Sequence, residues 1–447
     1  MFKKAVYFAL LAGTYAQSNG TIDLADPEPG NWGGNIGKAA TKHYNDFDYE
    51  VFMNDSYIPR PYRYELGSDY TVNENVMMDR QSPDTLAPPT VDFGSIENPR
   101  WHMSDSYNRL AIGGYARQQT VKDLPVAVDI AAVDMKLEPG AFRESHWHEQ
   151  SEWAYMFSGR VIISAINPDG QTFMGELGPG DVWFFPSSYI HSIQALEDGA
   201  EFLLIFDSGE FDENSTFLSA EALSRIPKSV INKNFGLAKD ATDFDNIPAQ
   251  QLYIFRGEMP IPSFEEQKKS INNPFGMMEN QTLLFPLSQM PWDEYDGGRV
   301  RIVDSSNFNA PSLDITVAQI QLDSGSLRTL HWHETASSAE WDFIISGTLR
   351  ATIYAGNGNS RTYDFNAMDV GYIEANNLHY LECVSEEPCE FLAAFKTSKY
   401  NDFEFGQFVT ATPRYTIQQH LRITDETFDA IQESVANKQI IVPNNCK

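Results

Sequence analysis

Residues 140–159 read Gly-Ala-Phe-Arg-Glu-Ser-His-Trp-His-Glu-Gln-Ser-Glu-Trp-Ala-Tyr-Met-Phe-Ser-Gly. It places His146, His148 and Glu152 at the spacing H-x-H-x3-E between two glycines. In a strand, residues two positions apart point to the same side. We therefore expect both imidazoles to face one cavity, and the carboxylate to join them from the following turn.

A fourth candidate ligand lies farther along the chain. Pro179-Gly180-Asp181 is followed by Pro186 and then by His191, in an apolar run that predicts another strand. Three imidazoles and one carboxylate suit a first-row divalent metal that keeps open positions for substrate or dioxygen. A single H-x-H pair is weak evidence, whereas the whole string in this order is specific.

The same string occurs a second time in the chain. Glu152 and Glu340 lie 188 positions apart, and so do His191 and His379. Of the nine histidines, six fall in the two predicted ligand sets. The second set consists of His331, His333, Glu340 and His379. Six residues separate His333 from Glu340 instead of three, so Glu334 remains an alternative ligand.

The first residues predict export. Lys3 and Lys4 precede a short apolar run, and Thr14-Tyr15-Ala16 ends in a small residue, as in a secretory signal peptide over 1–16. The run is too short for a membrane anchor, which takes about 20 apolar residues. We expect a secreted protein that has no membrane association. Sequons stand at Asn19, Asn54, Asn214 and Asn280 and could carry glycans.

Charge and cysteine content narrow the function classes. The formal net charge is −30, so nucleic acid is excluded as a partner and an acidified medium would suit the protein. Cys383 and Cys389 flank a predicted hairpin turn and could form a disulfide in an oxidising compartment, while Cys446 lies near the end. No cysteine is placed as a catalytic nucleophile.

The chain divides into segments of different pattern. Residues 17–90 predict an extended arm that wraps a neighbour or the first barrel, and from about 91 short strands alternate with turns, as in an all-β barrel. We assign 91–256 to the first domain, 257–298 to a linker and 299–447 to the second domain with helical segments near its end. The clearest predicted strands are Val126–Leu137, Trp153–Ile166 and Phe202–Phe206. Residues 219–239 predict two short helices outside the barrel, divided at Pro227.

The two strings resemble the signature of the cupins, and the chain as a whole resembles the bicupin oxalate decarboxylases. The likeness covers roughly residues 78–440 and includes Gly113-Gly114-Tyr115-Ala116-Arg117 and Asp212-Glu213-Asn214-Ser215-Thr216-Phe217. It implies an all-β fold of two tandem jelly-roll barrels with a few peripheral helices. It also implies up to two Mn²⁺ per chain, oxalate as substrate, dioxygen as catalytic partner and a homo-oligomer.

The resemblance assigns roles to two further residues of the first domain. Glu213 takes the place of the glutamate on the family's five-residue lid and would move the proton. Arg143 would bind the substrate, because its planar fork suits a carboxylate. Asn214 heads a sequon within this lid, and a glycan there would hinder closure.

The second domain keeps Arg328 but departs from the family pattern. Ala393 stands where bacterial members have a glutamate, and no lid sequence is found, although Asp402 and Glu404 lie nearby. We therefore expect catalysis in the first domain and a structural or electron-transfer metal in the second. Two alternatives remain: an oxalate oxidase that makes hydrogen peroxide and lacks the acidic lid, and a non-enzymatic storage bicupin that needs no intact ligand set.

Overall fold

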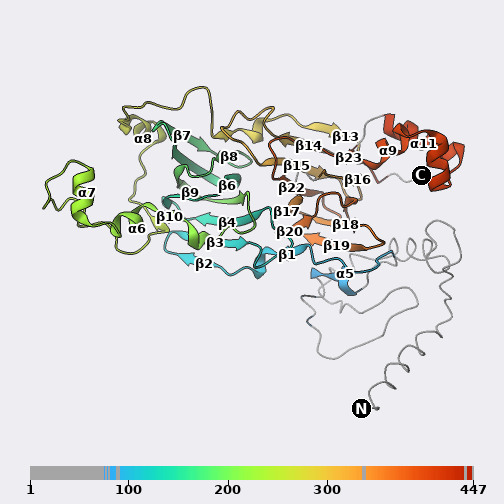
Figure 1. The fold of residues 1–447 in the computed structure, drawn as a ribbon, viewed down its shortest axis with the longest axis horizontal. Helices are drawn as coiled ribbons and strands as arrows, with labels where there is room; N and C mark the ends of the chain where they lie inside the picture. Colours follow the sequence, from blue (N-terminus) through green and yellow to red (C-terminus); the bar gives the residue numbers. More distant parts are fainter. Residues whose placement is uncertain are drawn as a thin grey trace, which may run out of the picture.

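The computed structural model describes residues 75, 78, 81–86, 91–334, 339–436 and 440–444. Figure 1 shows two β-barrels side by side, the first in cyan and green and the second in orange and brown. The predicted signal peptide, most of the predicted arm, the sequons at Asn19 and Asn54, and Cys446 lie outside the described residues. The predicted all-β bicupin fold is confirmed.

The first barrel is built on one continuous sheet with the strand order β12-β8-β6-β9-β4-β3-β2, to which β5, β7, β10 and β11 are attached. Its strands are β2 (Arg109–Ala111), β3 (Gly114–Gln119), β4 (Ala131–Leu137), β5 (Ala141–Trp147), β6 (Glu152–Ile166), β7 (Thr172–Leu177), β8 (Val182–Phe185), β9 (Ile190–Phe206), β10 (Phe217–Leu218), β11 (Ile254–Arg256) and β12 (Leu284–Phe285). The long strands β6 and β9 run through both layers of the barrel, and this is why the layers form one sheet. β5 pairs with β9, β10 and β11.

The second barrel has two separate sheets, β1-β20-β17-β22-β15-β14-β13 and β19-β18-β21-β16-β23 with β24 paired to β16. Its strands are β1 (Arg100–His102), β13 (Asp293–Tyr295), β14 (Gly298–Val303), β15 (Thr316–Leu322), β16 (Leu327–Trp332), β17 (Glu340–Ser346), β18 (Thr348–Tyr354), β19 (Ser360–Asn366), β20 (Asp369–Ile373), β21 (His379–Cys383), β22 (Cys389–Phe395), β23 (Phe403–Glu404) and β24 (Ile441–Val442). Here β17 and β18 correspond to β6, and β21 and β22 correspond to β9.

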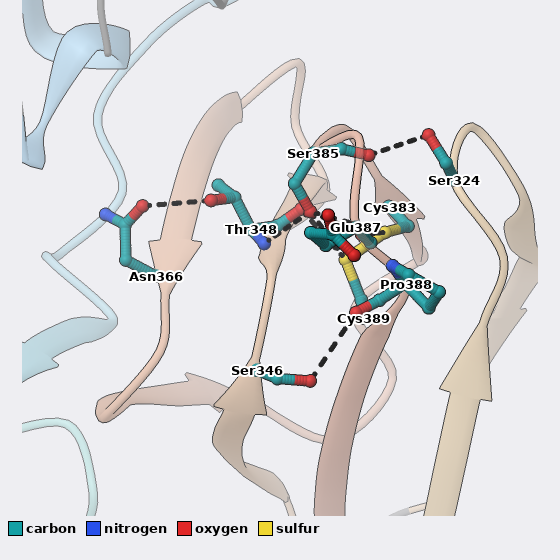
Figure 2. Close-up of a disulfide and its surroundings, with 9 residues drawn as sticks. All are labelled: Ser324, Ser346, Thr348, Asn366, Cys383, Ser385, Glu387, Pro388 and Cys389. Atoms are coloured by element: carbon teal, nitrogen blue, oxygen red, sulfur yellow. Dashed lines mark hydrogen bonds between the residues drawn. A yellow bond between two sulfur atoms is a disulfide. The ribbon is translucent and has the colours of Figure 1, made fainter.

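The break between β21 and β22 is closed by a disulfide (Figure 2). Cys383 and Cys389 are bonded, with their Cα atoms 5.6 Å apart, as the predicted hairpin turn allows. Ser385 within the turn accepts a hydrogen bond from the backbone N–H of Thr348 at 3.0 Å, so the turn is also fixed to the neighbouring strand. The disulfide that the sequence left open between Cys383 and Cys389 is present.

The two barrels exchange short segments, and the predicted domain boundaries miss this. β1 was assigned to the first domain, yet Arg100–His102 pair with residues 369–371 of β20 in the second barrel. β12 was assigned to the linker, yet it pairs with β8 of the first barrel. The predicted linker 257–298 also contains β13, which lies in the second barrel's sheet. The exchange could not be read from the sequence, because two- and three-residue strands carry no periodicity.

The described part of the predicted arm contacts the second barrel. The helix α5 (Pro83–Leu86) lies beside β19. Asp84 forms an ion pair with Arg100 at 2.7 Å, and Arg100 Nη1 donates to the carbonyl oxygen of Asp364 at 2.6 Å. Most of this ion pair is buried, so it holds the segment in place.

Short helices lie at the two ends of the molecule (Figure 1). Residues 219–239 form α6 (Ser219–Ser224) and α7 (Lys228–Asn234), which are divided at Pro227 as predicted. The remaining helices are α8 (Phe264–Ser270), α9 (Phe405–Ala411), α10 (Arg414–Leu421), α11 (Asp425–Ala436) and the 3-10 helices η2 (Met103–Asp105), η3 (Glu213–Ser215) and η4 (Leu287–Gln289). Among the residues that the structure describes, no helix combines the length and the apolar character needed to cross a membrane.

The predicted strands agree with the structure except at one start. β6 begins one residue before the predicted Trp153, and Phe202–Phe206 form the end of β9. The strand predicted over Val126–Leu137 begins only at Ala131. Residues 120–127 instead form turns in which the N–H groups of Leu124 and Ala127 donate to carbonyls three or four residues earlier. Their apolar side chains are buried there in the contact between the barrels, and this burial imitates a strand pattern.

The barrels pack through the outer faces of two sheets. A shared apolar cluster joins Trp153, Tyr155 and Leu203 of the first barrel with Trp341, Phe343 and Leu392 of the second. Polar contacts cross the same contact region, since Trp341 Nε1 donates to Gln119 Oε1 at 2.9 Å. The second barrel covers the outer face of this sheet, and the barrel core covers its inner face. The residues of β4 are therefore almost all buried and do not alternate between buried and exposed.

A buried carboxyl group lies on this outer face and makes stability depend on pH. Burial, assisted by the charge of Glu201, raises the pKa of Asp134 from 3.8 to about 7. The folded protein therefore binds this proton more tightly than the unfolded chain, and the free energy of unfolding falls as pH rises from about 4 to about 7. The second barrel has the neutral Gln319 at the matching register position, opposite Leu392 as Asp134 is opposite Leu203.

We expect Asp134→Asn to remove this slope. The variant should be more stable than the parent at pH 8, by on the order of 1–3 kcal/mol, and should gain nothing at pH 4. The measurement is urea unfolding of both proteins across this pH range, with the exposed Asp198→Asn as control. An advantage of Asp134→Asn that is equal at pH 4 and pH 8 would contradict the titration of Asp134.

Candidate metal centres and candidate active site

The first predicted ligand set comes together inside the first barrel. His146 is in β5 and faces His191 of β9 in the strand register, His148 follows β5, and Glu152 begins β6. One ligand atom from each of the four residues lies within 4.8 Å of all the others, and all four are buried. β5 ends at Trp147, β6 begins at Glu152 and β9 begins at Ile190, so one terminus of each strand reaches the cluster.

Backbone carbonyls fix the orientation of all three rings. Nδ1 of His146 donates to the carbonyl oxygen of Glu144 at 2.7 Å, Nδ1 of His148 to that of Gln150 at 2.7 Å, and Nδ1 of His191 to that of Tyr189 at 2.8 Å. A neutral imidazole that donates at Nδ1 presents a lone pair at Nε2. Three such lone pairs therefore converge on the Glu152 carboxylate.

This convergence fits a divalent cation. The Nε2 atoms of His146 and His191 lie 3.1 Å apart, and His148 Nε2 lies 3.3 Å from Glu152 Oε2. Two facing lone pairs at this distance repel each other unless a proton or a metal lies between them. Carbonyl contacts of this kind are typical of the outer partners of metal-bound histidines. The residues present therefore fit a His3Glu metal site.

Burial keeps these ligands in the form that binds metal. It lowers the pKa of His146 well below the ordinary value, and the nearby charge of Arg143 acts in the same direction. Burial also lowers the pKa of His191. For Glu152 burial alone would raise the pKa, but the close contacts with the His148 and His191 rings hold it below the usual range. The pKa shifts of His146, His191 and Glu152 all favour the deprotonated forms, which bind metal.

The second predicted set forms the same arrangement in the second barrel. His331, His333, Glu340 and His379 are buried, and their ligand atoms lie within 4.8 Å of one another. The structure decides between the two candidate carboxylates, since Glu340 Oε2 lies 2.8 Å from His379 Nε2. Glu334 is only half-buried and instead accepts a hydrogen bond from Asn401. The intervening residues 335–338 lie outside the described part of the chain.

Arg143 is the one cation buried beside the first cluster among the residues described. It is only 1% exposed, and its Nη2 donates to Glu213 Oε2 at 3.1 Å and to Thr216 Oγ1 at 3.4 Å. Its Nε and Nη1 find no partner among the described residues. A buried guanidinium with two donors left over is suited to a bound carboxylate.

Glu213, the acid of the predicted lid, lies beside Arg143. It begins the 3-10 helix η3, is 5% exposed and points to Arg143. Asp212 points away from Arg143, because it pairs with Lys122 at 2.7 Å on the outside. Asn214 is exposed while Glu213 is buried. A glycan on Asn214 would therefore extend into solvent with the lid closed, and the expected hindrance of closure does not follow.

Two residues of this site carry no signal in the sequence. Tyr253 is 4% exposed, and the guanidinium carbons of Arg143 and Arg109 lie 4.6 Å and 3.6 Å from its ring centroid. Glu144 accepts the backbone N–H groups of Tyr253 at 3.0 Å and Ala220 at 2.8 Å, and so ties two distant segments to β5. Tyr253 is placed at the site because β11 pairs with β5, and Glu144 reaches Ala220 because α6 lies against β5. Only the structure shows these contacts.

The two clusters on two barrels define a bicupin metalloprotein. The cupin family model matches residues 104–243 and 286–428, so each barrel is matched separately. Oxalate decarboxylase OxdC of Bacillus subtilis (strain 168) is 40% identical over 389 residues, which cover 87% of this chain and 98% of that protein. A probable oxalate decarboxylase of Arthroderma benhamiae is 35% identical over 381 residues, covering 84% of this chain and 91% of that protein.

The solved structures agree with these relatives. A structure of the Bacillus subtilis oxalate decarboxylase, studied for its Mn(II) centres, superimposes with a TM-score of 0.81 at 39% identity, covering 87% of this chain and 100% of the other. The chain therefore belongs to the bicupin oxalate decarboxylases of the cupin family.

Proposed function

We propose that this protein decarboxylates oxalate to formate and carbon dioxide in its first barrel, with bound manganese and with dioxygen as a catalytic partner. The observation that carries the proposal is the buried pair of Arg143 and Glu213 beside the first His3Glu cluster. The pair supplies a carboxylate-binding cation and a proton-transfer group at one metal centre. An oxalate oxidase would need only the first of these, and a storage protein neither.

Arg143 recognises the substrate. Oxalate is small and carries a carboxylate at each end, so one end can bind the metal while the other needs a cation. The unpartnered Nε and Nη1 of Arg143 can donate to that far end, and the neighbouring charge polarises its carbonyl. The His146, His148, Glu152 and His191 side chains would hold the manganese.

Glu213 moves one proton twice. It accepts the proton of the substrate's far carboxyl group, the carbon–carbon bond breaks, and carbon dioxide leaves. Glu213 then returns the same proton to the remaining carbon, which gives formate, so hydrogen oxalate is converted to formate and carbon dioxide with no atom left over. The chemistry that bound manganese supplies is Lewis acidity together with reversible one-electron oxidation of the substrate.

The lid keeps water away from these reaction steps. Glu213 is almost wholly buried although it lies on a surface loop, because η3 folds over the end of the barrel. Gln118 Oε1 accepts the backbone N–H of Glu213 at 3.3 Å and supports the closed position. Excluding water keeps a reactive carbon from alternative reactions. The experiment that tests the function is product analysis of oxalate turnover by the purified, manganese-loaded protein.

A conservative change at Arg143 should separate substrate binding from metal binding. Arg143→Lys keeps a positive charge but loses the planar fork, so we expect turnover of oxalate to fall at least tenfold while manganese content stays unchanged. Steady-state kinetics and metal analysis of the same sample measure both. The exposed Arg160→Lys is the matched control and should behave as the parent. Unchanged turnover in Arg143→Lys would show that another group holds the oxalate.

We propose that the protein is exported and glycosylated. The apolar segment in 1–16, the sequons and the disulfide between Cys383 and Cys389 support this, because disulfides persist in oxidising compartments. The sequons at Asn214 and Asn280 are both in the described chain, and Asn214 is exposed. Mass spectrometry of protein from the culture medium should find an N-terminus near residue 17 and glycan mass.

We also propose a homo-oligomer. Tyr107, Leu110 and Ile112 beside the edge strand β2 are 88%, 78% and 81% exposed, and such an apolar row is typical of a subunit contact. Light scattering of the purified protein measures the mass in solution, and a monomer would contradict this proposal.

A further inference from the structure

The arginine of the second barrel is already neutralised by the chain itself. Arg328 is 2% exposed, and its Nη2 donates to Asp402 Oδ2 at 2.6 Å and to Tyr400 Oη at 3.3 Å. Its Nη1 donates to Glu404. Among the described residues, its counterpart Arg143 has one carboxylate partner, Glu213, and two nitrogens without a partner. Two arginines at matching positions therefore differ in what they can still bind.

The strand register shows which residues of the two barrels correspond. In the first barrel Phe217 and Leu218 of β10 pair with Trp147 and His146 of β5. In the second barrel Phe403 and Glu404 of β23 pair with Trp332 and His331 of β16. Both Trp–Phe pairs are stacked with ring centroids 5.5 Å apart.

Counting back from these pairs places residues 398–402 where the first barrel has its lid, 212–216. Asp402 stands at the place of Thr216, Glu404 at that of Leu218, and the exposed Lys399 at that of Glu213. The second barrel thus has a segment in the lid position, but its acidic residues do not stand at the position of Glu213. The sequence alone does not reveal this, because Ser-Lys-Tyr-Asn-Asp shares no residue with Asp-Glu-Asn-Ser-Thr at matching positions.

This segment is tied down on several sides. The carbonyl oxygen of Asn401 accepts the Nδ1–H of the metal ligand His333 at 2.8 Å. Tyr400 Oη donates to Asp402 at 3.0 Å, and Thr329 Oγ1 donates to Glu404 Oε2 at 2.5 Å. Opening it would break the bond to His333 and take Asp402 away from the buried Arg328, which is costly. The first lid is held on the outside by Lys122, which pairs with Asp212, and on the inside by Arg143, which pairs with Glu213.

We propose that Asp402 and Glu404 are specificity-determining residues that exclude oxalate and other small carboxylates from the second metal centre. A dianion entering there would meet two carboxylates that already occupy the guanidinium, and like charges at contact distance repel strongly. The second centre then holds metal but no substrate, and the chain has one oxalate site. The inference rests on the proposed function only in taking oxalate as the ligand.

The test counts bound oxalate. All proteins are manganese-loaded and carry Glu213→Gln, so that turnover is slow, and oxalate is titrated by calorimetry. The parent should bind about one oxalate per chain. Replacing the two acids by their first-barrel counterparts, Asp402→Thr with Glu404→Leu, should raise this to about two. Adding Arg328→Gln should return it to about one. If the double variant does not fold, Asp402→Asn with Glu404→Gln removes the charges at nearly constant size, and the same gain is expected.

The outcomes separate this inference from the proposed function. A parent that binds two oxalates per chain, or acid-free variants that bind no more than the parent, overturns the exclusion. A parent that binds none counts against oxalate as the substrate of the first barrel. In that case a gain of one bound oxalate on removing the acids would still support the exclusion at the second barrel.

Discussion

Glu213→Gln should reduce formate production by roughly 10²–10⁴-fold, the range typical of a lost acid–base group. Glutamine has nearly the size of glutamate and can still accept a hydrogen bond from Arg143, so the closed lid should persist. It cannot take a proton from the substrate or return one to carbon. Part of the remaining turnover should divert to hydrogen peroxide, because the intermediate is then no longer protonated in time.

The neighbouring carboxylate provides the matched control. Asp212 is one peptide bond away, but it pairs with Lys122 on the outside and caps η3 through the N–H of Asn214 at 2.9 Å. Asp212→Asn should therefore cost far less, since exposed ion pairs contribute about 0–1 kcal/mol. The measurement is the rate of formate and of peroxide formation for both variants. If Glu213→Gln makes formate at the parent rate, the lid residue is not the proton-transfer group.

His148→Ala should abolish activity and empty the first metal centre. The substitution removes one of four ligands from a buried site in which His148 Nε2 lies 3.3 Å from Glu152. The remaining two imidazoles and one carboxylate would hold a divalent ion too weakly. Metal analysis should then find at most one manganese per chain, retained by His331, His333, Glu340 and His379.

The control for this change is a histidine outside both clusters. His420 is exposed on α10, and His420→Ala should keep full activity and both metals. Manganese content and formate production should be measured on the same preparations. Full activity of a His148→Ala protein that holds no metal in the first barrel would contradict metal-dependent decarboxylation.

The ligand sets could be read from the sequence because the chemistry demands them. A His-x-His pair on a strand, a glutamate and a later histidine at a repeated offset leave few other arrangements, and all eight residues are brought together as predicted. Only the choice between Glu334 and Glu340 needed the structure. The spacing between His333 and Glu340 is unusual, so the sequence does not tell which carboxylate points to the histidines. The structure answers this because Glu340 begins the strand β17.

The parts that escaped prediction depend on pairing between distant segments. The exchange of β1 and β12 between barrels involves three and two residues, which are too short to show alternation. Tyr253 reaches the first site because β11 pairs with β5, and Asp402 reaches Arg328 because β23 pairs with β16. Such long-range pairing leaves no periodic trace in the segment itself.

One measurement tests the central claim most directly: quantifying formate and hydrogen peroxide from a known amount of oxalate with the purified, manganese-loaded protein. We predict close to one formate for each oxalate consumed and little peroxide, because Glu213 lies buried beside Arg143, where it can protonate the carbon. Peroxide with carbon dioxide and no formate would contradict the account, since the first barrel would then oxidise oxalate and not decarboxylate it.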